Sequence, residues 1–200
     1  MFKSISLTNA MFVLVAGMCT LTGYQRAEGH APFNSALPPV SVTGMTPKEG
    51  PIETVVIITG SGFGAAQGAS TISFNGVAAT PIGWSNTEIK APVPSGASTG
   101  PVRLCVAGEC GIVGTFTVTP TIVSVSPLEG PVGAEVTIIG TGFGSNQGTS
   151  TVTFNGIIAT PASWSRTEIT VPVPTGATTG PLIVTVDGWP SNGITFTIIN

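Results

Sequence analysis

The sequence predicts an all-β protein built from two tandem β-sandwich domains, and three observations favour this fold class. Apolar and β-branched residues come in short runs between turn residues, with Gly 27 and Pro 17 among the 200 residues. A shift of 80 residues superimposes one part of the chain on another. No segment shows a sustained helical period, so we expect strands throughout both copies.

The internal duplication is continuous. Residues 47–118 align with residues 127–198 without a gap, and 38 of the 72 aligned positions are identical. Two segments that merely shared an amino-acid composition would not align over this length without a gap. Each copy has about 78 residues, which is enough for a small domain with its own hydrophobic core. We therefore expect one domain over residues 40–118 and a second over residues 120–198.

Residues 1–31 are expected to be a signal peptide with its processing region. They begin with one cation, Lys3, and continue with an apolar segment from Ala10 to Cys19. That segment has the length of a secretory signal and is too short to span a bilayer stably. The alternative is a buried N-terminal strand or helix. We expect a secreted or cell-surface protein without a membrane span.

The processing of this segment has two alternatives. Cleavage after Ala27 or Ala31 would leave residues 32–39 as a short disordered lead-in. Lipidation of Cys19 would instead turn the residues after it into a tether. Met18 counts against lipidation, because lipoprotein signals carry a small residue directly before the cysteine.

The charge content indicates that nucleic acid is not the partner. Only 8% of the residues are charged and the isoelectric point is about 4.9. Nucleic-acid binding requires clustered Lys and Arg. Beyond residue 31 the basic residues are few and scattered: Lys48, Lys90, Arg103 and Arg166.

The strands of the second copy are predicted from alternation of apolar and polar residues. Turn residues separate them, among them Asn155–Gly156, a dipeptide typical of two-residue hairpins. Seven short strands in fewer than 80 residues are typical of an immunoglobulin-like sandwich. The expected strands are 121–126, 134–140, 151–155, 157–162, 168–171, 181–187 and 194–199.

A glycine-rich loop follows an early strand in each copy and raises the question of a nucleotide site. A phosphate cradle needs such a loop to open a helix, whereas the residues that follow here alternate like a strand. We expect the glycines to permit positive φ where the chain crosses between two sheets, and the phenylalanines to plug the end of each core. These residues are Gly60, Gly62, Phe63 and Gly64 in the first copy and Gly140, Gly142, Phe143 and Gly144 in the second.

These repeated motifs resemble the IPT/TIG domain. The resemblance rests on "PLEGPVGAEVTIIGTGFG", "WSRTEITVPVPTGATTGP" and "SNG" in the second copy and on their counterparts in the first, and it covers residues 40–118 and 120–198. It implies an early-set immunoglobulin sandwich without catalytic machinery, of a kind found in plexins, some transcription factors and many bacterial secreted proteins. Such domains serve as spacers, as adhesion or interaction modules and as accessory domains of polysaccharide-processing enzymes. The DNA-contacting loops of the transcription-factor members are basic, and the equivalent loops here are not.

Few residues are suited to catalysis or metal binding. His30, the only histidine, lies in or near the segment expected to be removed, so no triad-like device is expected in the domains. No cluster of His and Cys is present, and Asp187 is the only aspartate. Glu88 and Glu168 would be a carboxylate pair only if the two domains shared a site. We expect no catalytic residue, no cofactor and no metal site.

Cys105 and Cys110 flank a predicted hairpin in the first copy. Residues that face each other across a hairpin lie within disulfide reach. The second copy has Thr185 and Pro190 there, so the bond would be an addition to one domain. Export of the protein would favour the disulfide, because disulfides form and persist in oxidising compartments. Two reduced thiols, typical of a cytoplasmic protein, are the alternative.

Three tryptophans remain as candidates for contact. Trp84 and Trp164 occupy equivalent positions and are expected to be structural, although aromatic platforms also bind sugars. Trp189 differs, because it lies at a predicted hairpin tip where the first copy has Glu109. Trp189 is therefore the candidate contact residue.

These observations predict a non-catalytic, exported interaction, adhesion or spacer module. Its partner would be an unknown protein or polysaccharide at the cell surface. The alternative is a carbohydrate-binding accessory module of the cell envelope, which tryptophans in line on an exposed face would favour.

Overall fold

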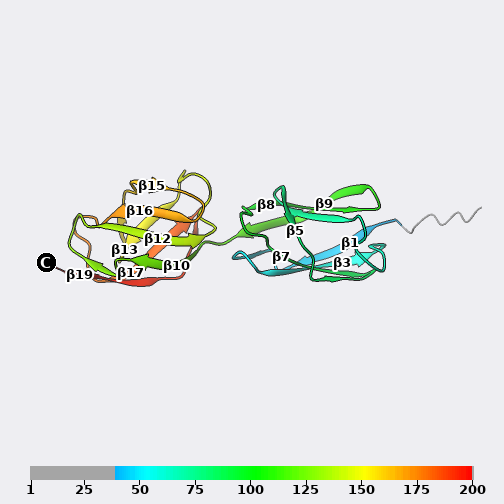
Figure 1. The fold of residues 1–200 in the computed structure, drawn as a ribbon, viewed down its shortest axis with the longest axis horizontal. Helices are drawn as coiled ribbons and strands as arrows, with labels where there is room; N and C mark the ends of the chain where they lie inside the picture. Colours follow the sequence, from blue (N-terminus) through cyan, green and yellow to red (C-terminus); the bar gives the residue numbers. More distant parts are fainter. Residues whose placement is uncertain (1–38, 200) are drawn as a thin grey trace, which may run out of the picture. The chain divides into compact units, whose positions relative to one another are not determined.

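The computed structural model describes residues 39–199. The predictions for the signal peptide, for lead-in residues 32–38, for Cys19 and for His30 lie outside these residues. Residues 39–199 form strands and turns without a helix, which confirms the predicted all-β class (Figure 1). Within them, no helix is long and apolar enough to cross a membrane.

The first sandwich, residues 41–118, consists of two sheets. Its strands are β1 (Ser41–Thr46), β2 (Glu49–Gly50), β3 (Val55–Ser61), β4 (Thr71–Phe74), β5 (Val77–Ala79), β6 (Gly83–Trp84), β7 (Glu88–Pro92), β8 (Gly100–Val106) and β9 (Glu109–Val118). One sheet has the order β1-β3-β7-β6 and the other has the order β2-β9-β8-β4-β5. All these pairs are antiparallel except the short pair of β2 with the end of β9.

The second sandwich, residues 121–198, repeats this plan. Its strands are β10 (Thr121–Ser126), β11 (Glu129–Gly130), β12 (Glu135–Thr141), β13 (Thr151–Phe154), β14 (Ile157–Ala159), β15 (Ser163–Trp164), β16 (Glu168–Pro172), β17 (Gly180–Val186), β18 (Trp189–Pro190) and β19 (Ile194–Ile198). The sheets have the orders β10-β12-β16-β15 and β11-β19-β17-β13-β14, and β18 pairs with β17. The two sandwiches therefore share one topology, as the duplication predicts.

The strands predicted for the second copy are present, with one error. The predicted strand 157–162 is wrong in its second half, because β14 ends at Ala159 and the chain crosses to the other sheet. There the N–H of Ala162 donates to the carbonyl of Thr170, and β15 begins one residue later. The prediction also missed β11, β15 and β18, which have two residues each.

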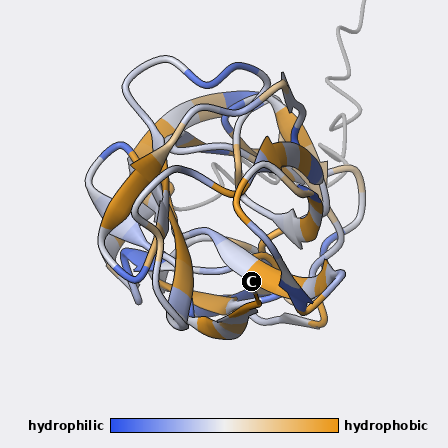
Figure 2. Cartoon of the chain, turned by 90° about the vertical axis from the view of Figure 1, so that its left-hand side faces the viewer, coloured by the Kyte–Doolittle hydropathy of each residue, from blue (hydrophilic) through white to orange (hydrophobic). Residues whose placement is uncertain are grey.

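Each sandwich has its own apolar core, filled by alternate residues of both sheets. The rings of Phe74 and Phe116 meet edge to face at 5.6 Å, and the equivalent Phe154 and Phe196 meet at 5.1 Å. Burying one such side chain contributes about 2 kcal/mol. Figure 2 shows apolar residues along the strands and hydrophilic residues mostly in the loops.

Candidate functional site

The glycine loop of each sandwich carries the chain from one sheet to the other. In the first sandwich it joins β3 to β4, and no helix follows it. Gly62 and Gly64 have φ values of 81° and 89°, and Gly142 and Gly144 have φ values of 76° and 79°. These backbone angles favour glycine, because a Cβ is strained there.

Gly60 and Gly140 correct one expectation, because neither has a positive φ. A Cβ at Gly60 would overlap the carbonyl oxygen of Ser41 and would lie 2.6 Å from the ring of Phe63. A Cβ at Gly140 would meet the equivalent atoms of its own sandwich. These two glycines are therefore required by close packing of strand against strand and of ring against backbone.

The backbone amides of the first glycine loop are already hydrogen-bonded within the sandwich. The N–H of Phe63 donates to the carbonyl of Asn86 at 3.2 Å, and the N–H of Gly64 donates to Asn86 Oδ1 at 3.1 Å. The N–H of Gly60 donates to the carbonyl of Thr87 at 3.0 Å. A bound phosphate would have to displace these bonds, so this geometry favours a structural corner over an anion site.

Trp84 and Trp164 pack against the two cores from the short strands β6 and β15. The indole N–H of Trp84 donates to the carbonyl of Phe63 at 3.0 Å, and that of Trp164 donates to the carbonyl of Phe143 at 2.9 Å. Each tryptophan therefore supports the corner of its own sandwich. Both are partly buried, so they do not present an open aromatic platform.

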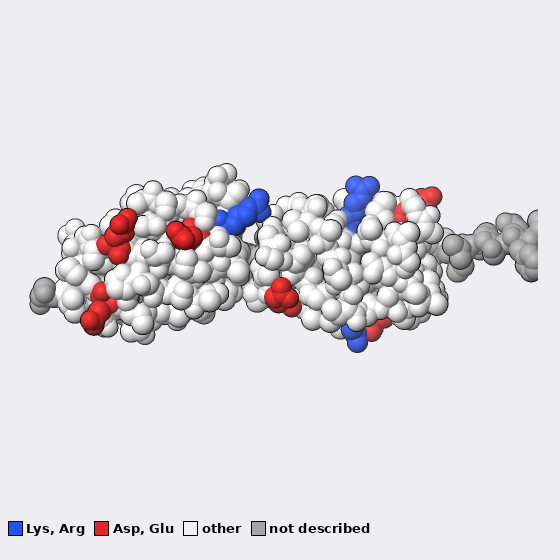
Figure 3. All heavy atoms as spheres, in the orientation of Figure 1, with Lys and Arg blue, Asp and Glu red and all other residues white. Residues whose placement is uncertain are grey.

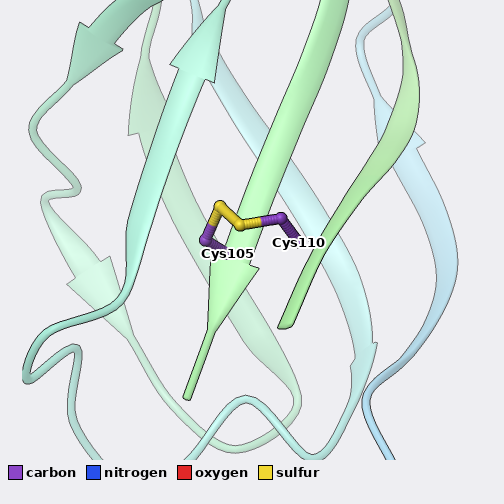
Figure 4. The surroundings of a disulfide bond; sticks show 2 residues. All are labelled: Cys105 and Cys110. Atoms are coloured by element: carbon purple, nitrogen blue, oxygen red, sulfur yellow. A yellow bond between two sulfur atoms is a disulfide. The ribbon is translucent and has the colours of Figure 1, made fainter. Parts of the chain in front are cut away.

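The predicted disulfide is present in the first sandwich (Figure 4). Cys105 in β8 is paired in register with Cys110 in β9, and their Cα atoms are 4.0 Å apart. The turn between the strands is Ala107–Gly108, with φ values of 50° and 90°. This two-residue hairpin with positive φ brings opposite side chains close together.

Trp189 lies next to the tip of the equivalent hairpin in the second sandwich. The turn itself is Asp187–Gly188, with φ values of 48° and 89°. Trp189 is the first residue of β18, is paired with Val186, and is 37% exposed. Trp164 belongs to the other sheet, so the two tryptophans of this sandwich do not form a row on one sheet.

The carboxylates are exposed and dispersed. Glu88 forms an ion pair with Lys90 at 3.3 Å, and both side chains are about half exposed. Glu88 is in β7 and Glu168 is in β16, in separate sandwiches. On the face drawn in Figure 3, most of the surface is uncharged. Residues 39–199 contain no group of three or more His, Cys, Asp or Glu residues that could hold a metal ion.

Asn192 is a residue that sequence analysis missed. Its Oδ1 accepts from the N–H of Ile122 at 2.8 Å, and its Nδ2 donates to the carbonyl of Ile122 at 3.0 Å. The first sandwich has Ile112 at the equivalent position, and Ile112 is 71% exposed. A signal for this difference exists in the sequence, because residues 109–114 and 189–194 differ at all six aligned positions, the longest such run between the copies.

Two stacked antiparallel sheets, repeated in tandem with the same glycine corners, define a protein of two immunoglobulin-like domains. The chain belongs to the IPT/TIG domain family, whose pattern it matches over residues 39–117 and 120–198.

Other similarities cover parts of larger proteins. A segment of 56 residues is 50% identical to cyclomaltodextrin glucanotransferase of Geobacillus stearothermophilus, and covers 28% of this chain and 8% of that enzyme. The surface glycan-binding protein PbSGBP-B of Prevotella bryantii is 17% identical, with a TM-score of 0.46 over 80% of this chain and 41% of its own. The plexin A4 extracellular region is 23% identical, with a TM-score of 0.37 over 90% of this chain and 20% of its own.

Proposed function

We propose that this chain is exported and acts at the cell surface as a non-catalytic interaction, adhesion or spacer module. One observation carries the proposal. The two sandwiches share a framework, yet one hairpin differs between them at the six consecutive positions 109–114 and 189–194. Variable segments held by a rigid scaffold are where binding residues usually lie.

Trp189 is the contact residue we propose within this hairpin. It is exposed to 37%, and the first sandwich has Glu109 in its place. A tryptophan side chain combines a large apolar surface with one N–H donor, so it suits recognition of a protein or a sugar ring. The low charge of the chain favours contacts made by shape and hydrogen bonding rather than by ion pairs.

Export is supported by the bond between Cys105 and Cys110. Disulfides form and persist in oxidising compartments, and this one joins exposed and half-exposed positions near a hairpin tip. The apolar segment from Ala10 to Cys19, expected to belong to a signal peptide, is consistent with the same compartment.

The alternative is a carbohydrate-binding module of the cell envelope. It is supported by the exposed tryptophan and by the similarity of 56 residues to a cyclomaltodextrin glucanotransferase. The separation of Trp164 and Trp189 onto different sheets counts against an extended aromatic row. A sugar contact would therefore depend on Trp189 and the polar residues near it.

The experiment is a pull-down with the processed chain against cell-envelope extract and a panel of insoluble polysaccharides. The variant is Trp189→Ala, and the matched control is Ile158→Ala, which removes a side chain of the same sandwich that is 67% exposed. A protein retained by the wild type and the control but lost with Trp189→Ala supports the interaction role. The same pattern with a polysaccharide supports the alternative. Equal retention by both variants would contradict a role for Trp189, and no retention on any matrix would leave only the spacer role.

A further inference from the structure

The edge of β1 in the first sandwich presents a peptide group that no backbone hydrogen bond within residues 39–199 satisfies. β1 is the terminal strand of its sheet, and Val42 is opposite Gly60 of β3. The N–H of Gly60 donates to Thr87 on its other side, so Val42 and Gly60 do not exchange backbone hydrogen bonds. The N–H and carbonyl of Val42 therefore point away from β3.

The second sandwich shows what kind of group fits this position. Ile122 is opposite Gly140 with the same register and the same bulge, and the N–H of Gly140 donates to Thr167. The outward N–H and carbonyl of Ile122 are both bonded by the carboxamide of Asn192, at 2.8 Å and 3.0 Å. A carboxamide offers both a donor and an acceptor, as a peptide group does. The position is therefore suited to a peptide group, and the bulge does not block it.

In the first sandwich this position is open. Ile112 replaces Asn192, cannot form either bond, and is the most exposed large hydrophobic residue of the described chain at 71%. Val42 and residues 109–113 of β9 line a groove between the two sheets. An unpaired strand edge beside apolar side chains suits an added strand, because it offers backbone bonds and apolar contacts together.

A second unpaired edge lies in the second sandwich. β14 is a terminal strand, and its Ile158 is opposite Thr153 of β13. The N–H of Asn155 donates to the carbonyl of Pro181, which precedes the β17 residues paired with β13, so Thr153, two residues earlier, also directs its backbone groups to β17. The N–H and carbonyl of Ile158 therefore point away from β13, as those of Val42 point away from β3.

The two edges are exposed in different copies of the duplicated domain. Ile158 is 67% exposed, whereas the first sandwich has the smaller Ala78 at the equivalent position. The groove beside β1 is open in the first sandwich, whereas Asn192 occupies the equivalent position in the second. One chain thus offers one open groove and one large apolar edge.

We propose that the β14 edge of one copy of this chain pairs antiparallel with the β1 edge of a second copy. Ile158 is then opposite Val42, and the two residues exchange both backbone bonds, as the carboxamide of Asn192 does with Ile122. Side chains of directly opposite residues share one face of a sheet. Because Val42 packs against the first core, Ile158 enters the groove beside Ile112.

The charges of the two edges favour a second copy over a charged partner. Exposed edge strands are commonly guarded by charged side chains, especially lysine. Neither residues 40–45 nor residues 157–161 contain a charged residue, so no repulsion opposes their pairing. The paired stretch is short on both sides, because β14 has three residues and the bulge of β1 follows Val42.

This contact joins two different surfaces, so it is heterologous. Each copy uses its groove for one neighbour and its β14 edge for another, and the copies therefore associate into a chain or a ring. The contact does not involve Trp189. Failure of self-association and failure of binding to an external partner would therefore give separate results.

Light scattering of the processed chain over rising protein concentration tests the proposal. The mass of the wild type should increase with concentration, and the amides of Val42 and Ile158 should exchange at least about tenfold more slowly in the associated sample. Ile112→Asn supplies the carboxamide of the second sandwich and Ile158→Lys places a charge on the β14 edge. Each variant alone should remain a monomer.

A mixture of these two variants gives the sharpest result. One functional edge of each kind remains in the mixture, so dimers should form and nothing larger. The matched controls are Ile82→Asn, 66% exposed in the first sandwich, and Val123→Lys, 67% exposed in the other sheet of the second. Both should associate like the wild type.

Three results would overturn the proposal. The first is a wild type that stays monomeric at every concentration. The second is association that persists in Ile112→Asn or in Ile158→Lys alone. The third is a mixture of these two variants that stays monomeric, because the contact would then not join the groove of one copy to the β14 edge of another.

Discussion

The carboxamide of Asn192 binds both backbone groups of Ile122, 70 residues earlier in the chain, with bonds of 2.8 Å and 3.0 Å. It thereby joins the edge strand β10 to the segment that connects β18 to β19. The first sandwich has no equivalent bond, and it has instead the disulfide between Cys105 and Cys110 close to the same position. The disulfide joins β8 to β9 within one sheet, whereas Asn192 ties the edge strand of the other sheet, so the two additions hold different parts of the framework.

Replacement of Asn192 by alanine should weaken the second sandwich. The variant loses two hydrogen bonds and leaves the partly buried N–H of Ile122 without its partner, so we expect a loss of about 1–3 kcal/mol. Amide exchange of Ile122 should accelerate together with a lower unfolding temperature. Asn146→Ala, at an exposed loop position of the same sandwich, is the control and should leave both unchanged.

Replacement of Trp84 or Trp164 by phenylalanine should destabilise each sandwich by a similar amount. Each variant removes the indole N–H that donates to the carbonyl of Phe63 or Phe143, at an expected cost of about 1–3 kcal/mol. Chemical denaturation would measure the loss. Trp189→Phe, at a more exposed position, should change stability by less than about 0.5 kcal/mol. An equal loss of stability in all three variants would contradict the conclusion that Trp84 and Trp164 support their sandwiches.

Alanine at Gly60 should be far more damaging than alanine at Gly68. The new Cβ at Gly60 would collide with the backbone of Ser41 and the ring of Phe63, which should cost more than about 3 kcal/mol. Gly68 has a φ of 53° and open space around it, so the cost there is only the strain of a positive φ, about 1 kcal/mol. Unfolding temperatures of the two variants would separate these effects, and a reversed order would contradict the packing argument.

Loss of the disulfide should destabilise the first sandwich and leave the second unchanged. The bond closes a short loop between residues five apart in sequence, which contributes about 2 kcal/mol on the chain-entropy model. Calorimetry of the variant with both Cys105→Ser and Cys110→Ser should show one transition moved to lower temperature. A shift of both transitions, or of neither, would be the contradicting result.

The sequence predicted the parts of the fold that depend on local pattern. Alternation located the strands, and Asn155–Gly156 forms the expected turn, with φ values of 45° and 86°. The crossing after Ala159 was missed, because residues 160–162 continue the strand-like composition and only their pairing reveals the change of sheet. The requirement for Gly60 was misassigned, because sequence alone does not distinguish a positive φ from a close approach of distant backbone.

The candidate site was predicted only in part. The bond between Cys105 and Cys110 followed from their spacing across a hairpin, a local relationship. The bonds of Asn192 to Ile122 join residues 70 positions apart, so no pattern within one hairpin could predict them. Ile112 was likewise overlooked, since its exposure has meaning only beside the unpaired edge of β1.

The most direct test of whether the glycine loops are corners of a sandwich is a titration of the labelled chain with inorganic phosphate and ATP. The backbone amide resonances of Phe63, Gly64 and Phe143 are recorded during the titration. With the amides of Phe63 and Gly64 bonded to Asn86, and with a strand rather than a helix after each glycine loop, the predicted result is no shift of any of the three resonances at millimolar ligand. A saturable shift of these resonances, confined to either glycine loop, would show an anion site there and would contradict the assignment of both loops to backbone geometry.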